Sequence, residues 1–139
     1  VDSIAFMRQA AEALKSADLS RTGPSITRLY TGRFAPEFEY EDWAEDWRTL
    51  VHAQFLHLSQ ATAAALLARE RVQDAIDVLS RVIELDPLAL SLRASLVRSL
   101  ARAGAADAAA DHYRQYANLM KREVGVRAPP FEVLISSEP

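Results

Sequence analysis

Two arginines in the second half of the chain have the spacing of an anion-binding pair. Arg98 and Arg102 lie four residues apart, so both side chains share one face if the segment is helical. Guanidinium groups bind carboxylates and phosphates through paired N–H donors, and together they could hold either group on a partner molecule. Alternatively, they are solvated side chains that pair with Glu70 or Asp107. The sequence leaves both interpretations open.

A second candidate surface combines acidic and aromatic residues. Six acidic residues lie between positions 37 and 46, interspersed with Phe, Tyr and Trp. The residues that could form one partner-binding surface are Glu37, Glu39, Tyr40, Glu41 and Trp43. Such a surface could recruit a basic partner, for example a polymerase subunit. Alternatively, the aromatic rings anchor the segment to the core, while the acids face water and stabilise the start of a helix at Asp42.

The sequence lacks cysteine and the common catalytic motifs, and its histidines do not have the spacing of a metal site. There is no cysteine, which excludes disulfides, thiolate metal sites and cysteine nucleophiles. His52 and His57 are five residues apart, whereas two metal ligands on a helix are four apart. No Gly-x-Ser-x-Gly, His-Glu-x-x-His or glycine-rich phosphate loop occurs. We therefore expect no enzyme activity, metal or cofactor. A small-molecule sensor remains a third option, because helical bundles can enclose ligand pockets.

Length and charge restrict the class of protein further. The chain has 139 residues, half of them hydrophobic and a quarter charged, with a net charge of −3. These values predict one globular domain over residues 1–139 without the positive field that holds a nucleic-acid backbone. No apolar run approaches the ~20 residues that span a bilayer, and no export leader opens the chain. We expect a cytoplasmic protein that does not contact the membrane.

The elements that must position these residues are all predicted to be helices. Alanine and arginine are abundant, only four residues are glycine, and no alternating strand pattern occurs. Six helices and a final helical turn are predicted over residues 2–17, 24–30, 42–69, 72–85, 88–103, 105–124 and 131–135. In the second of these, Pro24 occupies the first turn. The predicted core positions include Ile4, Met7, Ala11 and Leu14 in the first helix, Leu50 in the third and Leu88 in the fifth.

The second half of the chain repeats itself with a period of 34 residues. The aligned pairs are Leu66 with Leu100, Glu70 with Gly104, Ala75 with Ala109, and Leu79 with Tyr113. A 34-residue period built from two helices is typical of tetratricopeptide (TPR) repeats. The small residue at positions 75 and 109 lets the two helices of a pair lie close together, and Pro87 ends the second helix. The predicted fold is an all-α, TPR-like array of antiparallel helix pairs, stacked with a right-handed twist.

TPR pairs usually bind peptides on the inner face of the first helix of each pair. In the 34-residue register, these positions are His57, Gln60, Ala64 and Leu67, followed by Ser91, Ala94, Arg98 and Arg102. We call these eight positions the predicted binding row. The repeat by itself therefore supports one candidate function, a free-standing peptide-binding adaptor or scaffold.

Three motifs in a fixed order resemble one family. Residues 30–37 read Tyr-Thr-Gly-Arg-Phe-Ala-Pro-Glu and precede Trp43; residues 85–88 read Leu-Asp-Pro-Leu; residues 123–126 read Glu-Val-Gly-Val. Together they resemble the bacterial transcriptional activator domain, the TPR-like module of SARP-type regulators. The chain departs from the family pattern at Gly23-Pro24, where relatives continue a helix, at Leu90, where an acidic residue is usual, and at Arg93, where histidine is frequent.

This resemblance implies an effector and dimerisation domain of a transcriptional regulator. In that family the module follows a winged helix-turn-helix domain that binds promoter DNA. We therefore expect DNA contact only through a separate N-terminal domain outside this chain. The implied partners are a second copy of the chain, giving a homodimer, and an RNA polymerase subunit or a regulatory protein.

Overall fold

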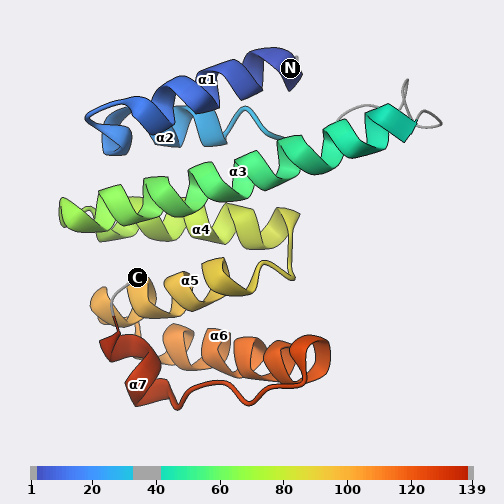
Figure 1. Cartoon of the computed structure of the whole chain (residues 1–139). Helices are drawn as coiled ribbons and strands as arrows, with labels where there is room; N and C mark the ends of the chain where they lie inside the picture. Colours follow the sequence, from blue (N-terminus) through green and yellow to red (C-terminus); the bar gives the residue numbers. More distant parts are fainter. Residues whose placement is uncertain (1–2, 33–41, 138–139) are drawn as a thin grey trace.

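The computed structural model describes residues 3–32 and 42–137, and within these two ranges it contains helices and no strands. The helices are α1 (Ser3–Lys15), α2 (Leu19–Thr27), α3 (Asp42–Ala68), α4 (Val72–Leu85), α5 (Leu90–Arg102), α6 (Ala106–Leu119), the π-helical turn η2 (Met120–Val124) and α7 (Phe131–Ser136). Successive helices form antiparallel hairpins stacked in layers from α1/α2 to α5/α6, and α7 lies beside the last hairpin (Figure 1). The predicted all-α, TPR-like array is confirmed.

The turns inside the two repeats have the same backbone geometry. Glu70 and Gly104, which are 34 residues apart, both have positive φ angles, 60° and 79°. The amide after each of them closes the turn on a carbonyl five residues earlier: Arg71 on Leu66 at 2.9 Å, and Ala105 on Leu100 at 3.0 Å. This is the hydrogen-bond pattern of a Schellman C-terminus. The 34-residue register predicted from the sequence is therefore present in the backbone.

The core of each repeat follows the same register. Ala75 and Ala109 are both 0% exposed, so α4 packs closely on α3, and α6 on α5. The stripe predicted for α3 is largely confirmed, since its fully buried members include Val51, Phe55, Leu58, Thr62 and Leu66. Helix α5 has eight buried residues out of 13, because α4, α6 and α7 all pack against it.

The second helix differs from its prediction. Helix α2 begins at Leu19, and Pro24 lies inside it rather than in its first turn. Proline lacks the N–H that would bond the carbonyl of Ser20, and Arg71 Nη1 donates to that carbonyl instead, at 3.2 Å. A Cβ on Gly23 would lie 2.3 Å from Thr62 Oγ1, so only glycine allows α2 this close to α3. A hydrogen bond from a distant arginine is not visible in local periodicity.

Three predicted core positions are wrong. Ile4 is 63% exposed, and Leu50 and Leu88 are each 53% exposed. The buried face of α1 instead consists of Phe6, Ala10 and Ala13. In this rotation the ring of Phe6 contacts that of Tyr30, with the centroids 5.6 Å apart. Leu88 belongs to the turn before α5 rather than to the helix.

Candidate functional site

The part of the predicted binding row on α5 faces the chain's own C-terminal helix. Arg98 Nε donates to the Leu134 carbonyl at 3.0 Å and to Ser137 Oγ at 3.1 Å. Leu134 itself is buried in a cluster with Ala94 and Val97. Arg98 and Ala94, both members of the row, therefore support α7 in this structure.

Arg102 points to a different segment. Its Nη2 donates to Glu70 Oε2 at 3.1 Å and to the Leu67 carbonyl at 3.4 Å, which ties α5 to the turn between α3 and α4. Arg98 and Arg102 thus bond to separate parts of the chain, and the structure does not bring them to a shared anion site. The pairing with Glu70, one of the two interpretations of the sequence, is the contact observed. Partner binding by either arginine stays a prediction.

Among the remaining positions of the predicted binding row, Gln60 makes a contact between helices and several others are exposed. Gln60 Nε2 donates to Ser95 Oγ at 2.9 Å, and Ser95 Oγ donates in turn to the Ser91 carbonyl at 3.2 Å. These bonds join α3 to α5. His57, Ala64 and Ser91 are exposed. In the α3 part, His57 and Ala64 are therefore accessible, whereas Leu67 is 3% exposed and belongs to the core. In the α5 part, α7 covers Ala94 and engages Arg98.

A network of hydrogen bonds that was not predicted from the sequence joins three separate elements. Tyr30 Oη bonds His52 Nδ1 at 2.7 Å, and His52 Nε2 bonds Asp86 Oδ2 at 2.8 Å. A neutral imidazole that donates through Nε2 and accepts the tyrosine hydroxyl satisfies both bonds. Asp86 Oδ1 also accepts the Leu88 amide at 3.2 Å. One sequence feature pointed to this network: His52 and Asp86 are 34 residues apart, which is the repeat period.

The burial of Tyr30 indicates that these hydrogen bonds hold helices in place. Tyr30 is 0% exposed and stacks on Phe55 with the centroids 4.3 Å apart. A tyrosine enclosed in this way cannot reach a solvent-borne substrate. The hydrogen-bond network holds the end of the first hairpin against α3 and against the turn that leads into α5.

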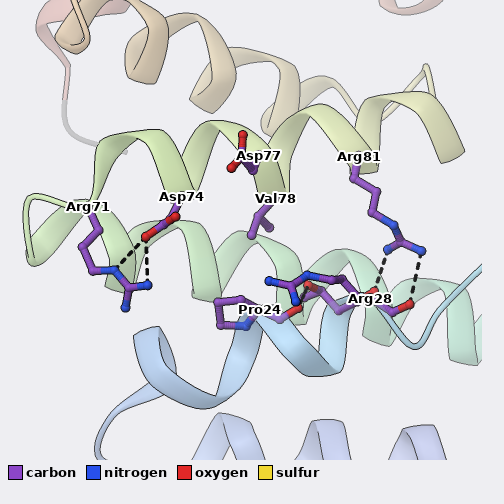
Figure 2. Close-up of a pocket in the computed structure, with 8 residues that line it drawn as sticks. Pro24, Arg28, Arg71, Asp74, Asp77, Val78 and Arg81 are labelled. Carbon is purple, nitrogen blue, oxygen red and sulfur yellow. Dashed lines mark hydrogen bonds and ion pairs between the residues drawn. The ribbon is translucent and has the colours of Figure 1, made fainter.

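A cleft of about 260 Å³ lies between α2 and α4. Its lining consists of Pro24, Thr27, Arg28, Arg71, Asp74, Asp77, Val78 and Arg81. Figure 2 shows Arg71 directed at Asp74, and Arg81 directed at the end of α2. Arg81 donates to the carbonyl of Thr27 at 2.7 Å, to that of Arg28 at 3.5 Å and to that of Tyr30. Since helix ends have unpaired carbonyls, Arg81 fastens α2 to α4.

A buried cation lies between α5 and α6. Arg93 is 7% exposed, and its guanidinium donates to the Pro87 carbonyl at 2.6 Å and to Gln115 Oε1 at 3.3 Å. Burial lowers the pKa of Arg93. Burial also lowers the pKa of His112, and the charge of Arg93 lowers it further. Nδ1 of His112 is buried without a hydrogen-bond partner among the described residues.

Comparison with known families identifies the family of the chain. The sequence matches the family model described as "Bacterial transcriptional activator domain" over residues 1–132. The chain belongs to this family. No curated protein and no solved structure matches the chain. The family groups domains of transcription regulators, which confirms the resemblance noted in the three motifs. Over the part of the chain that the structure describes, no helix is both long and apolar enough to span a bilayer.

The motifs of this bacterial transcriptional activator domain lie at helix ends and at contacts between helices. Tyr30 from the first motif and Asp86 from the Leu-Asp-Pro motif are the two ends of the hydrogen-bonded chain through His52. Gly125 from the third motif has a φ of 76° and ends η2, with its amide 3.0 Å from the Met120 carbonyl. Tyr30 and Asp86 therefore hold helices together, whereas Gly125 ends a helix.

The acidic-aromatic surface is not tested by this geometry. Glu37, Glu39, Tyr40 and Glu41 lie outside the described residues, and so does the side chain of Trp43. The neighbouring aromatic Trp47 donates from Nε1 to Ser3 Oγ at 2.8 Å. One aromatic residue of this region thus anchors the start of α3 to α1. A partner-binding role for the acidic-aromatic surface stays a prediction.

Proposed function

We propose that this domain is the effector and dimerisation module of a bacterial transcription regulator. It would associate with itself and contact the transcription machinery or a signalling protein in the cytoplasm. The observation that carries this proposal is the family match over residues 1–132. The net charge of −3 supports a division of labour in which a separate domain holds the DNA.

The architecture supports a docking role. A stack of helix hairpins exposes a long, continuous surface, which repeat proteins use for binding partners. The polar groups that could have served a reaction are used between helices: Arg81 on the end of α2, Arg98 on α7, and His52 between Tyr30 and Asp86.

A free-standing peptide adaptor is the alternative function. The exposed positions His57 and Ala64 on α3 favour it, since they belong to the row that TPR proteins use. The covering of Ala94 and the engagement of Arg98 by the C-terminal segment argue against an open groove along the whole row. An adaptor would bind a foreign peptide without activating transcription.

A transcription assay separates the two functions. The chain is fused to a monomeric DNA-binding domain of unrelated origin, and a reporter gene is placed behind the corresponding operator. We expect several-fold activation relative to the DNA-binding domain alone, and concentration-dependent self-association of the isolated chain in sedimentation velocity. The control is the same fusion carrying Leu79→Pro, which breaks α4. A folded fusion that occupies the operator without activating, together with a chain that stays monomeric, would contradict the proposal.

A further inference from the structure

The C-terminal segment lies on the last hairpin in the way that a bound peptide lies on a receptor. Tyr113 Oη donates to the Pro129 carbonyl at 2.7 Å, and its ring meets the ring of Phe131 edge-on, with the centroids 5.4 Å apart. Leu134 is 3% exposed and packs with Ala94 and with Val97. Both backbone and side chains of the segment are therefore recognised.

The end of the segment has a charged recognition group. Arg98 Nε donates to the Leu134 carbonyl and to Ser137 Oγ, so a guanidinium lies against the last turn of α7. Cations are favourable at helix C-termini, because the final carbonyls are unpaired and carry partial negative charge. We call the surface formed by Ala94, Val97, Arg98, Tyr113 and Tyr116 the C-terminal docking site.

The segment depends on this surface for its structure. Helix α7 has six residues, and helices shorter than about 12 residues are marginal in isolation. The connection to it is almost free of packing, since residues 121–127 are all exposed. Between η2 and the docked residues, the three residues 125–127 span up to about 10 Å when extended. These exposed residues can therefore redirect the segment away from its own hairpin without themselves losing buried contacts.

We propose that the C-terminal docking site binds residues 128–137 of a second copy of this chain, so that two copies exchange their C-terminal segments in a symmetric dimer. This inference rests on the proposed function, and it names the surface through which self-association occurs. A second copy is the occupant because it brings the same segment and makes the same contacts, which is the condition for domain swapping at low cost. The tether keeps the segment on its own hairpin at low protein concentration.

A peptide experiment tests the site itself. The full chain carrying Phe131→Ala and Leu134→Ala cannot dock its own segment, and circular dichroism checks that it remains helical. A fluorescent peptide of residues 126–139 should bind this variant at least ten-fold more tightly than it binds the unchanged chain, whose own segment competes. A peptide with Val133→Ala, a residue 55% exposed, should bind equally well. A peptide with Phe131→Ala and Leu134→Ala should not bind.

A cross-linking experiment tests the exchange and does not depend on that variant. Because the chain has no cysteine, single cysteines report one contact each. Chains with only Ser137→Cys are mixed at high concentration with chains carrying only Arg98→Cys, and then oxidised. We expect more cross-linked dimer than from the matched mixture in which Asp111→Cys, an exposed position, replaces Arg98→Cys.

The outcomes separate this inference from the proposed function. A chain that self-associates, while the folded variant fails to bind the peptide and cross-linking equals the control, would overturn the exchange and leave another surface for dimerisation. A chain that is monomeric and inactive in the reporter assay would contradict the proposed function itself.

Discussion

The two hairpins α3/α4 and α5/α6 have the same turn and different neighbours. Their turn residues, Glu70 and Gly104, share positive φ angles, and each pair of helices packs around a fully buried alanine. Hairpin α3/α4 lies between α2 and α5, whereas α5/α6 lies between α4 and α7. A hairpin's internal geometry therefore follows from its backbone and small residues, while its attachment to neighbours depends on side chains outside the repeat pattern.

The attachments of the two hairpins use the same chemistry on different segments. In the first, Arg71 and Arg81 donate to backbone carbonyls of the α2 region. In the second, Arg98 donates to a backbone carbonyl of α7. A guanidinium suits this task because its planar fork can satisfy several acceptors at a helix end. Arginine is therefore one of the residues that join these layers, beside Gln60 and His52.

The strongest test of the shared geometry enlarges the buried alanines. Ala75→Leu and Ala109→Leu should each lower the free energy of unfolding by about 1–3 kcal/mol, because extra methylenes strain a close-packed interface. Urea denaturation measures both values. Ala106→Leu, at an exposed position of α6, serves as the control and should change stability little. If one buried alanine tolerates leucine, the two hairpins do not share the same packing.

The attachments should differ in strength. Arg81→Ala removes donors from several carbonyls at the end of α2, and we expect a loss of about 1.5–3 kcal/mol, the range for hydrogen bonds to charged groups. Hydrogen exchange should show the loss first in α2.

Arg98→Ala should have a smaller effect, confined to exchange in α7. Its acceptors are one carbonyl and one hydroxyl near the chain end. Arg114→Ala, which removes a local ion pair between exposed side chains, is the control and should cost less than about 0.5 kcal/mol. If Arg98→Ala lowers hydrogen-exchange protection in α7 as much as Arg81→Ala lowers it in α2, the predicted difference is wrong.

The two turns should respond to substitution with opposite signs. Gly104→Ala places a Cβ on a left-handed residue and should lower stability by about 1 kcal/mol. Glu70→Gly relieves the same strain and should raise stability by about 0.5 kcal/mol, since the ion pair with Arg102 that it removes is largely exposed. Thermal unfolding measures both. Glu70→Ala removes the carboxylate and keeps the strain, so it should not be stabilising.

The smallest expected effect is a pH dependence in the second hairpin. Because burial and Arg93 lower the pKa of His112 below its ordinary value of 6.5, the unfolded chain binds this proton at a higher pH than the folded chain does. The free energy of unfolding should therefore decrease as the pH falls below about 6.5. His112→Gln should flatten this decrease between pH values of about 7.5 and 5.5, whereas His57→Gln, at an exposed position, should leave it unchanged. An equal slope in both variants would contradict this assignment.

Much of the fold could be predicted because it depends on local patterns. The bounds of α4, the 34-residue register and the burial of Ala75 and Ala109 follow from apolar spacing and small residues alone. The rotation of α1 could not be predicted, because both of its faces carry apolar residues and tertiary contacts, such as that between Phe6 and Tyr30, select one of them. The candidate binding row was predictable in register, but the covering of its α5 part by α7 was not.

By itself, the sequence determined the helices, their pairing and the family, since each is recorded in the order and period of neighbouring residues. Only the tertiary structure decided how Arg71, Arg81 and Arg98 are used, and that Tyr30, His52 and Asp86 form one chain of hydrogen bonds. The physical reason is that these bonds join residues 22 to 54 positions apart. Their partners are mostly backbone carbonyls and buried polar atoms, which every sequence contains and only a packed fold brings within reach.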